Sequence, residues 1–174
     1  GVLFGMGVNA LKTNLKTDIK DAQEFYNNYF ETFNGLAKYL DEVKAETERR
    51  GYTETMFGRR RYFAGIKSPL PFIRAQAERM AINAPIQGTE ADIVKIAMKR
   101  IDNLIKEKGW QSKTRLVLQV HDEIVYETED NFIEEAGKEF KNIMERVLEG
   151  KETYGVPIVA EASAGKNWNN LKSI

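Results

Sequence analysis

The sequence predicts an α+β protein in which an antiparallel sheet packs against long helices. The run from Leu116 to Glu127 has the composition of two short strands, rich in Val, Ile, Leu and Tyr, joined by a tight turn. Strands joined by so short a turn pair antiparallel. Elsewhere apolar residues recur at three- and four-residue spacing, which is typical of helices that bury one face.

The composition is that of an ordinary globular protein. The 174 residues suffice for one domain with a core, and 42% are apolar and 30% charged. The 26 basic and 26 acidic side chains cancel, so an anionic partner has to be bound by a local patch. The lack of cysteine excludes disulfides and thiolate metal sites and fits a reducing compartment. The single histidine excludes an all-histidine zinc site, and no apolar run reaches transmembrane length.

The first fifty residues predict a glycine-rich, apolar helix end followed by two helices. Because the chain opens on Gly1 instead of methionine, we expect a fragment or a processed piece. Asn34-Gly35 separates the two helices, and Thr17 or Asp18 can cap the first. Their expected ranges are 19–33 and 36–50. An apolar stripe along both helices predicts a buried face formed by Phe25, Tyr29, Phe33, Leu36, Leu40 and Val43.

Residues 52–63 predict a small hairpin with a basic turn. Arg59, Arg60 and Arg61 stand there among the aromatic residues Phe57, Tyr62 and Phe63. Guanidinium groups make bidentate contacts to phosphates, and the rings can hold the loop in place. A DNA-backbone contact and a solvated basic turn both fit this pattern.

A long helical region follows, opened by Pro69 to Pro71. We expect one helix over 72–83, a kink at Pro85 and a second helix over 86–108. Arg79, Asn83 and Gln87 form a polar row at four-residue spacing. Every DNA base pair offers acceptors in the minor groove, so such donors can contact any correctly shaped pair without reading sequence. A solvated helix face is the alternative.

The turn of the long hairpin lacks the residues that a two-residue turn prefers. Its expected tip is Asp122-Glu123, preceded by His121, where a two-residue turn prefers Asn-Gly or Asp-Gly. Adjacent carboxylates repel each other, and a broken local rule often marks a functional site. Paired carboxylates suit a hard cation such as Mg²⁺, although a solvated polar turn also fits.

The last fifty residues predict a helix and a final strand. Residues 131–148 carry an amphipathic pattern, and residues 157–162 have the composition of a strand that could pair with the hairpin. Trp168 is expected to pack at the terminus.

Four segments together resemble a known family. They are residues 1–7 (GVLFGMG), 51–61 (GYTETMFGRRR), 78–92 (ERMAINAPIQGTEAD) and 119–123 (QVHDE). In this order they resemble the C-terminal part of the bacterial DNA polymerase I family, the family A DNA polymerases, over essentially the whole chain. The resemblance implies a palm fragment, with a fingers remnant over 1–50 and a palm portion over 51–174.

The resemblance also implies roles for individual residues. Asp122 matches the carboxylate that binds the catalytic magnesium ions, and Glu123 matches an acidic residue with a supporting role. Phe4 matches an aromatic beside the templating position, where many members carry tyrosine. The remaining matches contact DNA: Arg74 on the template side, Arg79, Asn83 and Gln87 in the minor groove, and His121 near the primer terminus.

The implied activity is DNA-directed DNA synthesis with two Mg²⁺ ions, on primer-template DNA and deoxynucleoside triphosphates. The family also requires a second metal-binding aspartate and an Arg and a Lys for the triphosphate. We find no replacement for them, because Glu90 and Asp92 stand on a predicted helix without a motif. We therefore expect a polymerase piece that is inactive without its N-terminal part, in the cytoplasm at the nucleoid. The alternatives are a non-catalytic duplex-binding module of the same fold and an unrelated α+β domain.

Overall fold

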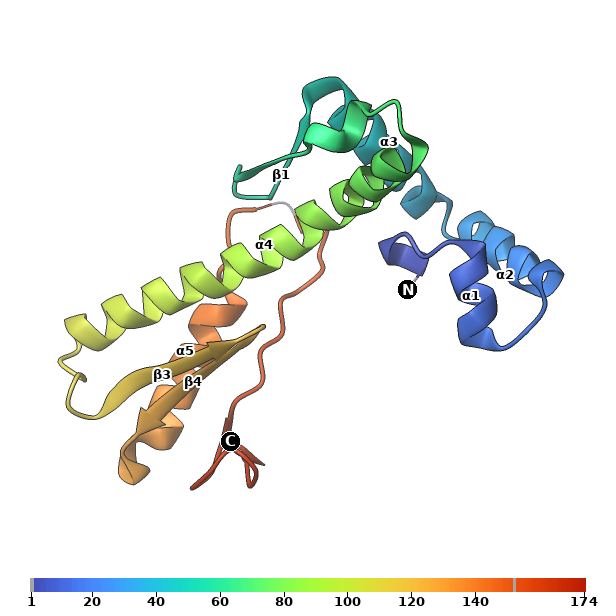
Figure 1. Ribbon diagram of the computed structural model, residues 1–174. Coiled ribbons are helices and arrows are strands. Elements are labelled where there is room, and N and C mark those ends of the chain that lie inside the picture. Colours follow the sequence, from blue (N-terminus) through green and yellow to red (C-terminus); the bar gives the residue numbers. More distant parts are fainter. Residues whose placement is uncertain (1, 152) are drawn as a thin grey trace. The chain divides into compact units, whose positions relative to one another are not determined.

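The computed structural model describes residues 2–151 and 153–174 (Figure 1). Two compact units divide the chain, Gly1–Gly88 and Thr89–Ile174. The first contains η1 (Val2–Phe4), α1 (Val8–Leu15), α2 (Ile19–Thr32), α3 (Asn34–Arg50), β1 (Tyr52–Glu54), β2 (Arg60–Tyr62) and η2 (Ala64–Lys67). The helix α4 (Pro71–Glu107) continues through the boundary. The second unit adds β3 (Thr114–Val120), β4 (Glu123–Thr128), η3 (Asp130–Phe132), α5 (Ile133–Glu145), β5 (Ser163–Ala164) and β6 (Lys172–Ser173). The α+β class predicted from the sequence is confirmed, in a mostly helical chain with small antiparallel sheets.

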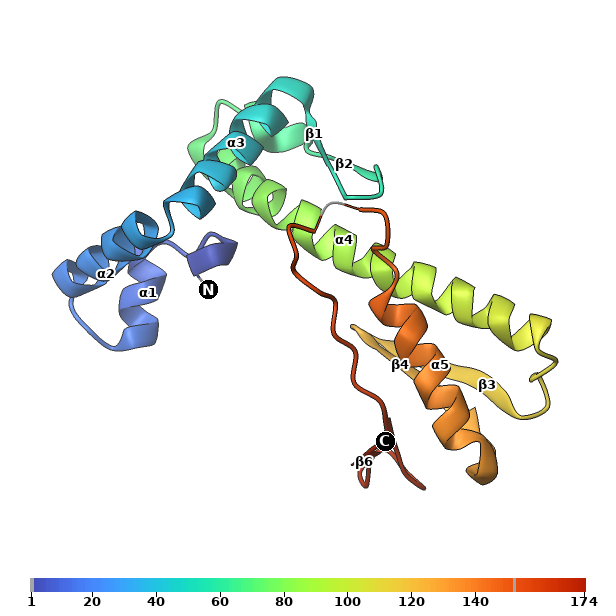
Figure 2. The same cartoon turned by 180° about the vertical axis from the view of Figure 1, so that it is seen from behind.

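The helices of the first unit follow the predicted ranges closely. The Asp18 carboxylate caps α2 by accepting hydrogen bonds from the backbone N–H groups of Lys20 and Asp21, at 2.8 and 2.9 Å. A short helix, α1, lies beside α2 in the segment for which the sequence predicted only a glycine-rich, apolar helix end (Figure 2).

The predicted buried stripe along α2 and α3 is only partly correct. Leu40 is buried, but Phe25 and Phe33 are 48% and 52% exposed. The buried residue of α2 is the small Ala22, which lets α2 approach its neighbour closely and leaves the rings outside. The rings instead contact one another along the helix, for example Tyr29 and Phe33 with centroids 5.0 Å apart. Aromatic spacing alone therefore did not identify the core.

The core of the first unit joins α4 to the segment that follows the basic hairpin. Its buried members are Phe63, Ile66, Ala77, Ala81 and Ala84. The prediction that two helices meet at Pro85 is wrong, because α4 runs through this residue. A proline inside a helix costs about 3 kcal/mol. Burying each large apolar side chain, such as Ile82 or Val94, contributes about 1.5–3 kcal/mol in return.

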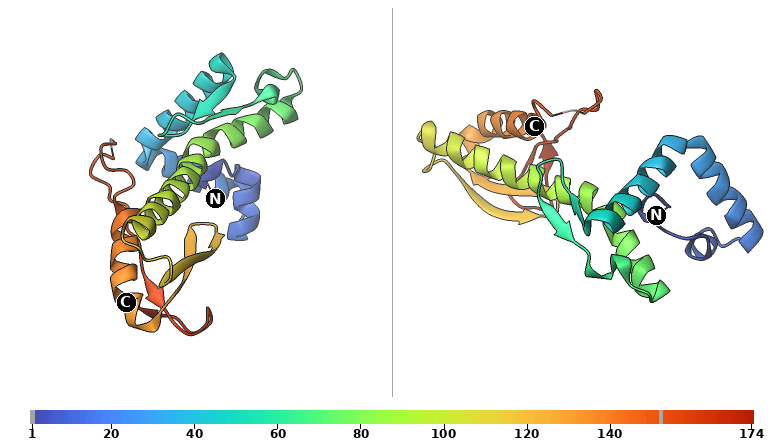
Figure 3. Two further views of the ribbon diagram at one scale, coloured as in Figure 1. Left: turned by 90° about the vertical axis from the view of Figure 1, so that its left-hand side faces the viewer. Right: turned by 90° about the horizontal axis from the view of Figure 1, so that it is seen from above.

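The second unit is built around the hairpin of β3 and β4. These strands pair antiparallel, and α5 lies along the hairpin (Figures 2 and 3). The core comprises Ile101, Ile105, Trp110, Phe132, Ala136 and Phe140. From β4, Ile124 and Tyr126 pack against it, and burial raises the pKa of Tyr126 to about 12. One face of β4 is thus fixed to the helices.

The C-terminal segment differs from the prediction. Residues 157–162 form no strand, and the paired strands are β5 and β6, farther along the chain. Pro157 lacks the N–H that a sheet ladder needs, and Val159 is 72% exposed. Trp168, expected to pack at the terminus, is 53% exposed. Among the described residues, no helix combines the length and the apolarity needed to cross a lipid bilayer.

Replacing Ile101 by alanine tests the core of the second unit. Ile101 is fully buried, so its loss should lower the free energy of unfolding by about 2–5 kcal/mol. The matched change Ile86→Ala on the same helix, at a residue 39% exposed, should cost less than about 1 kcal/mol. Urea unfolding followed by circular dichroism measures both, and equal losses would contradict this core.

Candidate functional site

The basic hairpin holds one of its arginines in an internal network. Arg60 donates a hydrogen bond to Glu54 at 2.7 Å, and Arg50 donates to the same carboxylate at 3.0 Å. The guanidinium carbons of Arg50 and Arg60 lie 4.4 and 4.7 Å from the centroid of the Tyr52 ring. The bond from Arg60 holds the pKa of Glu54 below its ordinary value. Arg60 is therefore already paired within the hairpin, which leaves it less available to a phosphate.

The other two arginines have different surroundings. Arg59 donates a hydrogen bond to the Gly88 carbonyl on α4 at 2.9 Å. A Cβ on Gly88 would lie 2.7 Å from the Thr55 methyl group, so this close contact requires glycine. Arg61 is exposed, and its guanidinium lies 5.5 Å from the Phe63 ring centroid. Within the part of the chain that the structure describes, Arg61 forms no ion pair, and it is the best-placed arginine for a phosphate.

The polar row lies on one face of α4, as the four-residue spacing predicts. Arg79 and Gln87 are exposed, whereas Asn83 is half-buried. Arg74, five residues before Arg79, lies 3.9 Å from the Glu78 carboxylate. Because α4 continues through Pro85, the side chains of Arg79, Asn83 and Gln87 stay on the same face of one helix.

The segment that carries Phe4 lies against this same face. The Asn83 amide donates to the Phe4 carbonyl at 3.4 Å, across 79 residues of sequence. The Phe4 ring is 43% exposed. Gly5 has a φ of +81°, and a Cβ there would lie 3.1 Å from Cγ of Arg79. The first unit therefore brings together Phe4, Arg79 and Asn83. Sequence reasoning singled out these three separately but gave no role to Gly5 or Gly88, because nothing in a single sequence reveals what a glycine touches.

The acidic turn lies in the second unit and is shifted by one residue from its predicted position. Val120 pairs with Glu123, so the two loop residues are His121 and Asp122, and Glu123 begins β4. His121 has a φ of +52°, a left-handed conformation that costs a non-glycine residue about 1–2 kcal/mol. The Gln119 side chain donates to the His121 carbonyl and braces the turn.

The carboxylates of the turn fit part of a magnesium site. Asp122 and Glu123 are exposed, and carboxylate oxygens are the ligands that Mg²⁺ prefers. The described residues nevertheless contain no group of three acidic or histidine side chains close enough to hold an ion. The turn can therefore contribute to a metal site without completing one.

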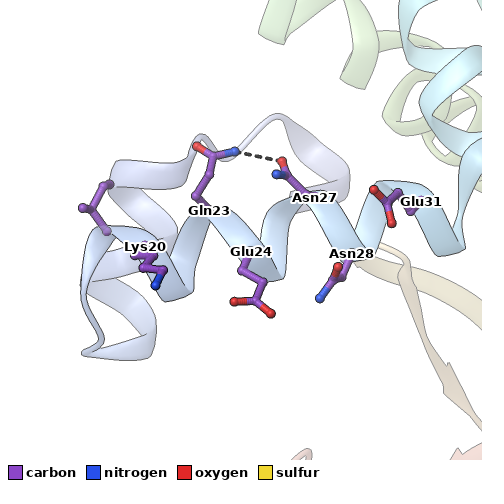
Figure 4. A pocket seen from close by; sticks show the side chains of 7 residues that line it. Lys20, Gln23, Glu24, Asn27, Asn28 and Glu31 are labelled. Atoms are coloured by element: carbon purple, nitrogen blue, oxygen red, sulfur yellow. Dashed lines mark hydrogen bonds between the residues drawn. The ribbon is translucent and has the colours of Figure 1, made fainter.

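A hollow along α2 offers no comparable chemistry. It is lined by one face of a single helix, and Gln23 donates to Asn27 at 2.9 Å within it (Figure 4). Its labelled side chains spread along the helix without converging on a point. It carries no functional assignment.

Comparison with known proteins matches this chain to one family. The family model described as DNA polymerase family A matches residues 1–170. DNA polymerase I of Streptococcus pneumoniae is 41% identical over 172 residues, which is 99% of this chain and 19% of that protein. DNA polymerase I of Pseudomonas aeruginosa is 38% identical over 169 residues, 97% of this chain and 18% of that protein. This chain thus spans about a fifth of the length of these relatives.

A solved structure gives the same result. The POL domain of Pol1 from M. smegmatis, in complex with DNA primer-template and dNTP, matches with a TM-score of 0.80 and 37% sequence identity. The match covers 84% of this chain and 26% of that one. A family match over nearly the whole sequence, with relatives well above a third identical, leads to one conclusion: the chain belongs to DNA polymerase family A.

Proposed function

We propose that this chain supplies the C-terminal part of the active site of a DNA-directed DNA polymerase. Its residues 1–50 would belong to the fingers and residues 51–174 to the palm. The single observation that carries the proposal is the family match over residues 1–170. It is supported by an exposed Asp122 in a strained, braced turn.

The first unit would bind the primer-template duplex. Arg79, Asn83 and Gln87 present donors along one face of α4, which suits the minor-groove acceptors common to all base pairs. Arg61 would meet a phosphate, while Arg59 and Arg60 would act mainly by holding the hairpin. Arg74 would contact the template side, and the exposed Phe4 ring would stack beside the templating position.

The second unit would supply the acidic turn. Asp122 would hold magnesium, Glu123 would support it, and His121 would lie near the primer terminus. The two ions, when bound, activate the primer 3′-hydroxyl and stabilise the departing pyrophosphate. The rigid turn would hold its carboxylate in place and so orient the 3′-hydroxyl towards the incoming nucleotide.

A second carboxylate would have to come from polypeptide outside this sequence, since no group of three ligands occurs among the described residues. The Arg and the Lys that the family requires for binding the triphosphate would also come from that polypeptide. The same observation keeps a second candidate open, a non-catalytic duplex-binding module.

The isolated chain should bind duplex DNA but fail to extend a primer. It contains the residues proposed to contact DNA, whereas its described residues contain no group of three acidic or histidine side chains that could hold a metal ion. Primer extension with Mg²⁺, run beside a salt-dependent binding assay, separates the possibilities. Robust incorporation by the chain alone would refute the claim of incompleteness.

Asp122→Asn should abolish synthesis when the chain is joined to the preceding part of a relative's polymerase domain. The amide keeps the shape of the side chain but is a poor magnesium ligand, so the rate should fall at least about 10³-fold. Binding of primer-template should change less than about threefold. Asp41→Asn, at an exposed carboxylate on α3, is the matched control and should retain activity. Near-normal turnover by Asp122→Asn would exclude a metal role.

Gln87→Ala should impair extension more than initial binding in the same joined protein. Losing one minor-groove hydrogen bond costs about 1 kcal/mol, a roughly fivefold fall in kcat/KM for the next nucleotide. Gln76→Ala, an exposed glutamine on the same helix, serves as the control. Equal effects of the two substitutions would argue against a minor-groove contact at position 87.

A further inference from the structure

We propose that Gly5 is a positioning residue. It couples the Phe4 ring, which would lie beside the templating base, to Arg79 and Asn83, the minor-groove donors proposed on α4. This inference rests on the proposed function and extends it to a residue that the proposed function leaves without a role. Two independent contacts within the first unit carry it.

The first contact is steric. Gly5 has a φ of +81°, and a Cβ built on it would lie 3.1 Å from Cγ of Arg79 and 3.1 Å from Cδ1 of Ile82. Such separations are tighter than ordinary side-chain packing, and Ile82 is buried and cannot move easily. Any larger residue at position 5 would therefore displace either its own segment or the stem of Arg79.

The second contact is a hydrogen bond from the next turn of the same helix face. The Asn83 amide donates to the Phe4 carbonyl at 3.4 Å, near the upper limit for such a bond. Its Oδ1 is buried and has no hydrogen-bond partner among the described residues. An amide with one long bond and one unsatisfied oxygen is held weakly, so a minor-groove acceptor can compete for it.

These contacts link two functions through one backbone segment. The Phe4 carbonyl accepts a hydrogen bond from Asn83, and a Cβ on Gly5 would crowd Arg79, one helical turn away from Asn83. A terminal base pair of the wrong shape would displace these donors, and the displacement would move the Phe4 ring. The shape of the last pair would thus influence how the next templating base is received.

The contact itself is tested without DNA, by ¹⁹F NMR of the whole chain carrying 4-fluorophenylalanine at position 4. Arg79→Ala and Gly5→Ala should each shift the resonance, whereas Gln76→Ala and Gly7→Ala should leave it in place. Gly7 has nothing within 4 Å of a built Cβ and an extended backbone, so it is a matched control for Gly5. Unchanged spectra for Arg79→Ala and Gly5→Ala would overturn the proposal.

The consequence is tested by extension from matched and mismatched primer ends in the joined polymerase. Gly5→Ala should lower kcat/KM on a matched end about tenfold and on a mismatched end much less, which reduces discrimination. In an Arg79→Ala background Gly5→Ala should have no further effect on that ratio. Gly5→Asn, which tolerates positive φ, should reproduce the loss if the Cβ contact is responsible.

These experiments can fail for the role of Gly5 and for the proposed polymerase function separately. Equal losses on both primer ends, or independent effects of positions 5 and 79, would make Gly5 a structural residue only and overturn the inference. Absence of synthesis by the unsubstituted joined protein would instead count against the proposed function, and the ¹⁹F spectra would still decide whether positions 4, 5 and 79 are coupled.

Discussion

The packing of β4 against the helices of the second unit is the interaction on which the proposed chemistry depends. Ile124 and Tyr126 contact the core formed by α4, Trp110 and α5, and this fixes the register in which β4 meets β3. A shift by one residue would turn the inward side chains outward and move the carboxylate away from the loop. Because Val120 pairs with Glu123, Asp122 is held in the turn. The left-handed conformation of His121 is maintained by this pairing and by the Gln119 brace.

The first unit uses a different principle, the close approach of backbone to a helix. Gly5 lies against α4, where a Cβ on it would crowd Arg79. Gly88 lies on α4 itself, where a Cβ would crowd Thr55 of the basic hairpin. Small residues on α4 serve the same end, since Ala77, Ala81 and Ala84 pack against the segment beyond the basic hairpin. Donors placed along one helix face would suit the role proposed for this row, contact with the minor-groove acceptors that all base pairs share.

Local chemistry made much of this predictable. Helix α2 begins after the expected cap at Asp18, and both hairpins lie where strand-forming residues flank turn residues. The row on α4 has the expected spacing. The predictions that were wrong depend on tertiary packing, which hydrophobic periodicity does not reveal. They are the burial of Phe25 and Phe33, the interruption of the helix at Pro85, and the strand over residues 157–162. Similarly, the three arginines of the hairpin looked equivalent in sequence, yet Arg60 pairs with Glu54 and Arg59 binds a carbonyl. The metal, template and primer roles remain predictions.

The most direct measurement of the central claim is the position of a bound metal. Mn²⁺ can replace Mg²⁺ at oxygen ligands, and its anomalous scattering locates it without ambiguity in a crystal of the joined polymerase with primer-template DNA and a nucleotide. We expect an anomalous peak within about 2.5 Å of an Asp122 carboxylate oxygen, with a second carboxylate contributed by the added polypeptide. Metal bound entirely by other residues, with Asp122 unliganded, would contradict it.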